Sequence, residues 1–192
     1  MKILAIEDGG FDFVEPSKRK RRALLVGVIT SDFRIEKLVI SSVQVDGLDA
    51  TSRVIGIAKK ERIPLDLIML GSISIAGFNL IDILEVYATL KIPLIVANSK
   101  EPKEGAIEGA LRHHFSDWQE RLRIIEKMKK PRKLVLSETE STYLQVAGVS
   151  LIRARKLIKE LTVFGKQPEP LRVAHILAHE LSRRGPEVAC KK

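Results

Sequence analysis

The chain has 192 residues, of which 45% are hydrophobic and 30% charged, and its formal net charge is +9 at pH 7. This length suits one domain, expected over residues 1–192, that buries about 70% of the surface of its unfolded chain. The excess of positive charge favours acidic partners, nucleic acid first. The single cysteine excludes a disulfide framework. No apolar run reaches the roughly 18 residues of a membrane span, and the N-terminus is unlike a signal peptide. We therefore expect a cytoplasmic protein without membrane contact, whose oligomeric state the sequence does not indicate.

The first fifty residues predict three strands joined in an antiparallel meander. Residues 2–6 form a short apolar strand that runs into Glu7 and Asp8. Residues 23–30 and 35–45 are rich in β-branched residues, and a Ser-Asp pair marks the turn between them.

A βαβ unit follows the meander. Residues 49–62 predict a helix, and residues 67–70 predict a fully buried, parallel strand between a proline and Gly71. A loop of small residues leads to Asn79, which is predicted to cap the next helix, and residues 94–96 predict a second buried strand. Ligands of open α/β sheets bind at the carboxyl ends of such strands, so the loop after residue 70 is the expected place for a site.

The rest of the chain predicts helices and two short strands. The helices span residues 105–111, 117–130, 151–162 and 171–184, and the strands span 133–136 and 142–146. The order of three antiparallel strands, helix, strand, helix and strand fits an α/β fold of ribonuclease H-like architecture. Its mixed sheet of three antiparallel and two parallel strands places the first strand beside the fourth, with flanking and C-terminal helices.

Two acidic segments follow strands that should end at one edge of this sheet. Glu7 and Asp8 follow the first strand, where a carboxylate is costly unless it is paired, hydrogen-bonded or bound to metal. Their side chains point to opposite faces, so one of the two enters a given site. Asp49 follows the third strand. The alternatives are an Asp8-Gly9 turn and a helix cap at Asp49. We expect Asp49 and one of Glu7 and Asp8 to share a cleft beside residues 71–79.

Other residues favour contact with phosphate. Gly77 and Asn79 are placed at a predicted helix N-terminus, which attracts phosphate through free amides. A pair of histidines, His175 and His179, has helical spacing but lacks the glutamate of zinc proteases. A run of five cations has no interleaved aromatic residue, which predicts contact with the nucleic-acid backbone, or else a solvated loop. The run consists of Lys18, Arg19, Lys20, Arg21 and Arg22.

Four segments carry a resemblance to a known family. They are AIEDGGF, VDGLDAT, LGSISIAGFNLID and PEPLRVAH, beginning at residues 5, 45, 70 and 168. They resemble the motifs of the mostly archaeal domain of unknown function family 99, a relative of endonuclease V. The last segment is similar to the PEP-x-R-x-A-H/D segment of endonuclease V itself. Together with the order of strands, the resemblance covers most of the chain.

The resemblance implies a magnesium-dependent nuclease that cleaves near deaminated purines. Glu7 or Asp8 matches the first-strand aspartate of endonuclease V, Asp49 lies where its glutamate falls, and His175 matches its C-terminal metal-site residue. These residues imply a Mg²⁺ or Mn²⁺ site for phosphodiester hydrolysis. The chain departs from the family pattern at Gly71, where endonuclease V has an aspartate, and in lacking the P-Y-I-P wedge.

Three functions stay open from the sequence. The first is a metal-dependent endonuclease with a partly degenerate site. The second is a non-catalytic nucleic-acid-binding protein on the same scaffold, and the third is a protein that binds a small phosphorylated ligand at Asn79. If the first is correct, Gly71→Asp should raise metal affinity, because hard cations gain from each added anionic oxygen.

Overall fold

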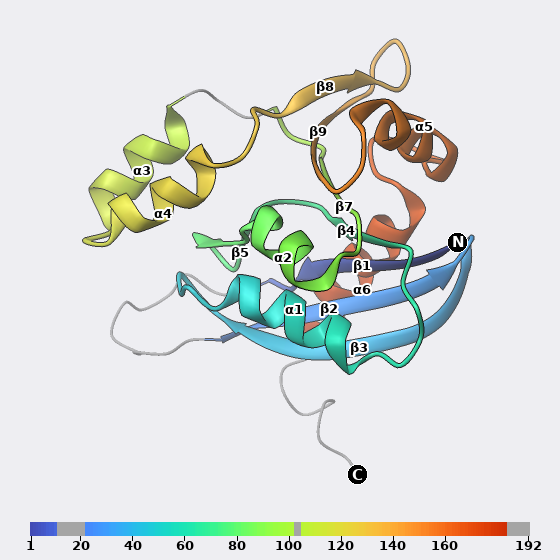
Figure 1. The fold of residues 1–192 in the computed structure, drawn as a ribbon, viewed down its shortest axis with the longest axis horizontal. Coiled ribbons are helices and arrows are strands. Elements are labelled where there is room, and N and C mark those ends of the chain that lie inside the picture. The colour runs from blue at the N-terminus through green and yellow to red at the C-terminus, as the bar shows by residue number, and fades with distance from the viewer. Residues whose placement is uncertain (11–21, 102–104, 184–192) are drawn as a thin grey trace.

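A computed structural model describes residues 1–10, 22–101 and 105–183 and has a seven-stranded sheet at its centre (Figure 1). The strand order is β3-β2-β1-β4-β7-β9-β8. These strands are β1 (Lys2–Asp8), β2 (Arg22–Ser31), β3 (Arg34–Gln44), β4 (Leu67–Leu70), β7 (Leu94–Asn98), β8 (Arg132–Val135) and β9 (Ser141–Ala147). A separate hairpin pairs β5 (Ser74–Ile75) with β6 (Asn79–Leu80). The helices are α1 (Ala50–Lys60), α2 (Ile83–Leu90), α3 (Ala106–His114), α4 (Trp118–Glu126), α5 (Leu151–Leu161) and α6 (Glu169–Arg183).

The directions of the strands confirm the mixed sheet that the sequence predicts. β1 pairs antiparallel with β2, which pairs antiparallel with β3, so β1 and β3 run the same way. β4 lies beside β1 and β7 beside β4, both parallel, with Ile6 opposite Leu70. The carboxyl ends of β1, β3 and β4 therefore meet at one edge of the sheet. We call this the carboxyl edge.

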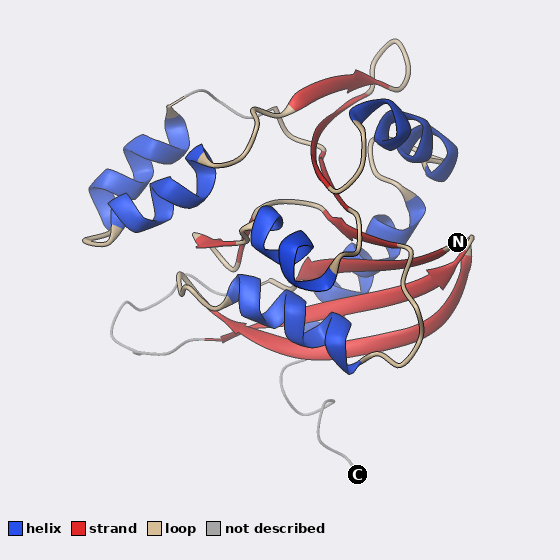
Figure 2. Cartoon of the chain, in the orientation of Figure 1, coloured by secondary structure: helices blue, strands red, loops and turns tan. Residues whose placement is uncertain are grey.

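Helices cover both faces of the sheet (Figure 2), which is why its central strands are continuously apolar. Leu4 and Ile6 of β1 pack into a core with α1 and α2. Ile3 and Ala5 pack on the other face, into a core with α5 and α6. α3 and α4 form a pair beside the sheet rather than over it. None of the helices within the described ranges is long and apolar enough to cross a membrane.

The start of α2 differs from the sequence prediction. Asp82, not Asn79, is the cap, and its Oδ1 accepts hydrogen bonds from the amides of Leu84 (3.1 Å) and Glu85 (3.0 Å). Asn79 lies in β6 and is fully buried. The prediction of an Asn79 cap was wrong because the hairpin of β5 and β6 delays the helix by three residues. A carboxylate already occupies the amides of the first turn, so this helix end does not offer them to phosphate.

Candidate active site at the carboxyl edge of the sheet

Glu7 and Asp8 are the last two residues of β1 rather than the start of a loop. Both are paired with β2, opposite Val26 and Leu25. The Gly9 amide also continues the pairing, donating a 2.9 Å hydrogen bond to the Leu24 carbonyl, so the strand does not turn at Asp8-Gly9. Since successive strand residues face opposite sides, Glu7 points to the α6 face and Asp8 to the α1 and α2 face.

Glu7 is a buried carboxyl group with one unpaired oxygen. The residue is 8% exposed, and its Oε1 has no hydrogen-bond partner in the described part of the chain. Burial first, and then the charge of Asp8, raises the pKa of Glu7 from 4.5 to about 8. The other oxygen, Oε2, lies 4.0 Å from Nδ1 of His175 on α6. A buried polar atom without a partner is costly, so this oxygen is a candidate ligand atom.

Gly71 provides the space for the Glu7 carboxyl group. A β-carbon at position 71 would overlap Glu7 Oε1 and lie 2.8 Å from its Cδ, inside any allowed contact. Gly71 is not among the residues with positive φ in the described ranges. Glycine at position 71 therefore leaves room for the Glu7 carboxyl group. It is not required by the local backbone conformation.

Asp8 is tied to the hairpin of β5 and β6. Its Oδ2 accepts a 2.6 Å hydrogen bond from the Ala76 amide. Burial raises the pKa of Asp8, and the hydrogen bonds from the Ala76 amide and its own amide, with the charge of His175, offset part of that rise. Asp8 is thus held on the face opposite Glu7, close enough for its charge to act on the Glu7 carboxyl group.

Asp46 joins the same hairpin from the loop after β3. The Asp46 amide donates to the Ala76 carbonyl (2.9 Å), and its Oδ1 accepts from the Phe78 amide (2.9 Å). Its φ of 55° is in the left-handed region, which aspartate tolerates better than most residues. Asp8 bonds to the amide of Ala76 and Asp46 to its carbonyl, so the two aspartates flank this residue.

Asp49 lies at the same edge but already has partners. Its Oδ1 accepts from the Gln44 amide (3.0 Å) and from Asn79 Nδ2 (2.7 Å), and its Oδ2 accepts from Arg53 Nε (2.9 Å). Burial alone would raise the pKa of Asp49, but the hydrogen bonds from Arg53, the Gln44 amide and Asn79 hold it below the usual value. Asp49 occupies the cap position of α1 without capping it. Its carboxylate is neutralised by these contacts.

Gly77 and Asn79 have roles inside the fold. The Asn79 amide group donates to the Gln44 carbonyl (2.8 Å) and to Asp49, and its Oδ1 accepts from the Ala50 amide (2.9 Å). Gly77 has a φ of 84°, and a β-carbon there would meet Asp46. These contacts use the whole polar end of Asn79, which argues against the phosphate contact predicted for it.

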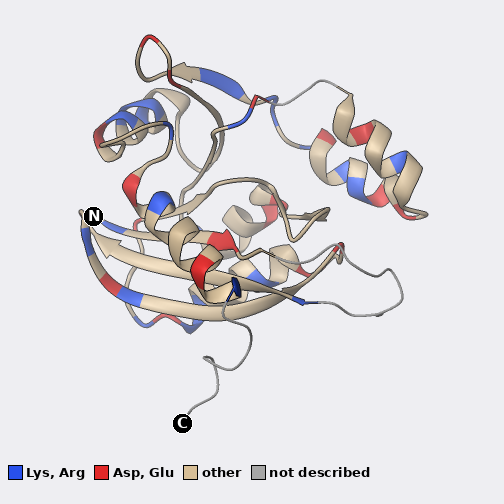
Figure 3. Ribbon diagram, turned by 180° about the vertical axis from the view of Figure 1, so that it is seen from behind, with Lys and Arg blue, Asp and Glu red and all other residues tan. Residues whose placement is uncertain are grey.

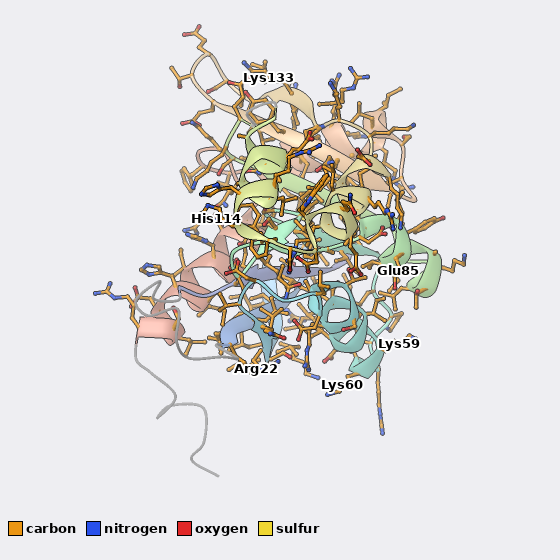
Figure 4. All side chains as sticks on the ribbon, turned by 90° about the vertical axis from the view of Figure 1, so that its left-hand side faces the viewer. Arg22, Lys59, Lys60, Glu85, His114 and Lys133 are labelled. Carbon is orange, nitrogen blue, oxygen red and sulfur yellow. The ribbon has the colours of Figure 1, made fainter. Side chains whose placement is uncertain are left out.

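Of the predicted cationic run, only Arg22 lies within the described residues; Lys18, Arg19, Lys20 and Arg21 fall outside them. Arg22 begins β2 at the carboxyl edge. Its Nε donates to Ser42 Oγ (2.8 Å), and its guanidinium lies 3.8 Å from Asp49 Oδ2. Figure 4, which looks at the molecule from the side of this edge, shows Arg22 at the lower part of the sheet and Lys133 at the top. Further Lys and Arg residues gather on α5 and β8 (Figure 3).

Arg121 is a structural residue of the site that sequence reasoning missed. It is 4% exposed, although it lies on α4. Its NH1 group donates to the carbonyls of Gly47 (3.0 Å) and Phe78 (2.7 Å), and its NH2 group donates to the Asp46 carbonyl (2.8 Å). Asp117 pairs with it through two hydrogen bonds. The i,i+4 spacing of Asp117 and Arg121 was the available signal, but only the fold shows that the pair holds the Asp46 loop against the hairpin.

The described residues contain no group of three or more His, Cys, Asp or Glu side chains arranged to hold a metal ion by themselves. The structure does bring Glu7 and His175 together on the α6 face of the carboxyl edge, with Asp8 next to them on the other face, and it places Asp49 farther along that edge with its own cationic partners. Mg²⁺ in proteins is commonly held by one or two carboxylates, with waters and substrate phosphates completing its shell. The unpaired, buried oxygen of Glu7 fits such an ion.

The fold is ribonuclease H-like and is similar to that of endonuclease V. Human endonuclease V superposes with a TM-score of 0.63 at 12% identity, covering 95% of this chain and 84% of that chain. Endonuclease V of Ciona intestinalis, in a complex with DNA containing an inosine followed by a ribo-adenosine, superposes with a TM-score of 0.59 at 10% identity, covering 95% of this chain and 86% of that chain.

Residues 1–182 match the family model described as endonuclease dU, and the chain belongs to this family. A relative from Thermococcus gammatolerans, named UPF0215 protein, is 34% identical over 93% of this chain and 90% of its own length. A crystal structure from Archaeoglobus fulgidus has a TM-score of 0.80 at 29% identity, covering 94% of this chain and 97% of that chain. The comparisons confirm the resemblance to the archaeal family and to endonuclease V, and they support a role in nucleic-acid processing.

Proposed function

We propose that the chain is a metal-dependent endonuclease whose ion is held by Glu7, beside His175 and Gly71. The observation that carries the proposal is the buried Glu7 oxygen without a partner among the described residues. Retaining such a group is unfavourable unless something binds it. The names of the family and of the neighbouring structures supply the substrate class, nucleic acid with a deaminated base.

Each residue has a role that follows from its position. Glu7 would supply the anionic oxygen on the α6 face, and Asp8, held on the other face by the Ala76 amide, would add its negative charge nearby. When bound, a divalent cation supplies polarisation of a phosphodiester and neutralisation of its developing charge. His175, whose side chain is 55% exposed, lies where it can exchange a proton with a substrate at the mouth of the site. Asp49 would orient Asn79 and Arg53 rather than bind the ion.

The binding of Mn²⁺ tests the proposal directly. Calorimetry at pH 8 should show a site in the unmodified protein, and Glu7→Gln should weaken it at least about tenfold. His175→Ala should weaken it less, and His179→Ala is the matched control. His179 stacks on His175 one turn along α6 but is paired with Glu180, 3.5 Å away. Unchanged Mn²⁺ affinity in Glu7→Gln would refute the proposed site.

Cleavage then separates the enzyme from a binding protein. Strands that contain deoxyuridine, inosine or neither should be incubated with Mg²⁺ and with EDTA. The proposal expects cutting only with the metal and only of the modified strands. If the protein binds Mn²⁺ and nucleic acid but cuts none of the strands, the non-catalytic function is correct.

A further inference from the structure

At the end of β4, the space beside Gly71 is filled by a carboxyl group from the neighbouring strand, β1. Glu7 is on β1, yet its Oε1 lies where the side chain of position 71, at the end of β4, would begin. We propose that Glu7 and Gly71 form a matched pair, in which the longer side chain on β1 supplies the ligand oxygen at the end of β4. This inference rests on the proposed function, because it assigns the position from which Glu7 holds the ion.

The lengths of the side chains support this assignment. A β-carbon at 71 would lie 2.8 Å from Glu7 Cδ and 3.1 Å from Oε2, and would overlap Oε1. An aspartate at this position would therefore place its own carboxylate in the volume that Glu7 now fills. The space between positions 7 and 71 therefore has room for one carboxyl group and not for two.

The two oxygens of Glu7 differ in their surroundings, since Oε2 lies 4.0 Å from His175 Nδ1 and Oε1 is buried and meets no polar partner among the described residues. The backbone around it is already paired, since Glu7 lies opposite Val26 on one side and the adjoining Ile6 lies opposite Leu70 on the other. A side chain that served only to fill this space would be apolar. A carboxyl group in this position indicates a ligand atom.

This pairing corrects the expectation for Gly71→Asp. The sequence predicts that an added carboxylate tightens metal binding. The structure shows that the new aspartate side chain would collide with Glu7 and place a second negative charge against it, so the single substitution should not tighten binding. The relevant change moves the carboxylate instead of adding one.

The experiment is a swap. Glu7→Ala should weaken Mn²⁺ binding at least about tenfold, and Glu7→Ala with Gly71→Asp should restore it to within about threefold of the unmodified protein. Binding is measured by calorimetry and by the electron paramagnetic resonance signal of free Mn²⁺, with a thermal melt of each metal-free variant. Restoration supports the pair. If Glu7→Ala weakens binding and the swap leaves it equally weak in a folded protein, the pair is refuted while the proposed function stands. If Glu7→Ala has no effect, the proposed function itself is wrong.

Gly71→Ala provides a second test that does not depend on the swap. The atom it would strike is the end of a flexible side chain, so Glu7 can move aside and the protein should fold. Displacing the carboxyl group should weaken Mn²⁺ binding as much as Glu7→Gln does, and the two changes together should weaken it no further. Gly56→Ala on α1 is the matched control, because a β-carbon there meets no atom within 4 Å. A folded Gly71→Ala protein with unchanged Mn²⁺ affinity would overturn the inference.

Discussion

Replacing Glu7 by glutamine should change how the stability of the metal-free protein depends on pH. The pKa of Glu7 is raised from 4.5 to about 8 in the folded state, so the folded protein retains a proton that the unfolded chain releases. A raised folded pKa gives stability that is fully present below pH 4.5 and is lost as pH rises through about 8. Each unit of pKa difference is worth about 1.4 kcal/mol. The difference of about 3.5 between 4.5 and 8 thus gives a loss of about 5 kcal/mol, as an upper bound, by about pH 9.

Glutamine has the same shape and cannot ionise, so Glu7→Gln should remove this loss. Urea unfolding with EDTA, from about pH 5 to 9, measures the free energy of unfolding of both proteins. We expect the variant to be the more stable at the alkaline end by several kcal/mol, with the gap closing toward the acidic end. Asp8, whose pKa is also raised, contributes to the slope in both proteins. Glu160→Gln, an exposed side chain on α5, is the control. Parallel curves for Glu7→Gln and the unmodified protein would refute the burial of an unpaired carboxyl group at this edge.

Three further predictions concern the structure around the site and its partner. Asp82→Ala should cost about 1 kcal/mol of stability through loss of the α2 cap, and a thermal melt that does not shift would contradict that role. Arg121→Met should cost about 3 kcal/mol in urea unfolding, because one buried and two half-buried carbonyls lose their donor, whereas Arg112→Met, at an exposed pair on α3, should cost less than about 1 kcal/mol. Neutralising the run from Lys18 to Arg22 should weaken DNA binding equally across sequences and reduce its salt dependence by about 0.9 per lost phosphate contact; an unchanged slope would exclude this run from the interface.

The order of the strands could be read from the sequence because it depends on local signals. Apolar runs of strand length, the turn between β2 and β3, and the proline before β4 located most elements within a few residues. Ser150 caps α5, and its Oγ accepts from the Arg153 amide at 3.2 Å. A side-chain cap of this kind acts within four residues, so the sequence alone determines it. Once the order and the directions of the strands were predicted, it followed that β1, β3 and β4 end at the same edge of the sheet.

Which carboxylates have charged or hydrogen-bonding partners was decided only by the tertiary structure. Asp8 and Asp49 are similar in sequence, since each comes after an apolar run of strand length. In the structure, Asp49 meets Arg53 and Asn79, whereas Asp8 meets backbone amides and the charge of His175. Gly71 has no local signature of its role either, because its need for an absent side chain comes from Glu7 on the neighbouring strand. These two residues lie far apart in the chain and contact each other through the parallel pairing of β1 and β4, and no local pattern encodes that contact. The sequence itself determined the sheet and its acidic edge. The three-dimensional pairing determined which acid is left unpaired there, because burial and charge neutralisation depend on neighbours that are distant along the chain.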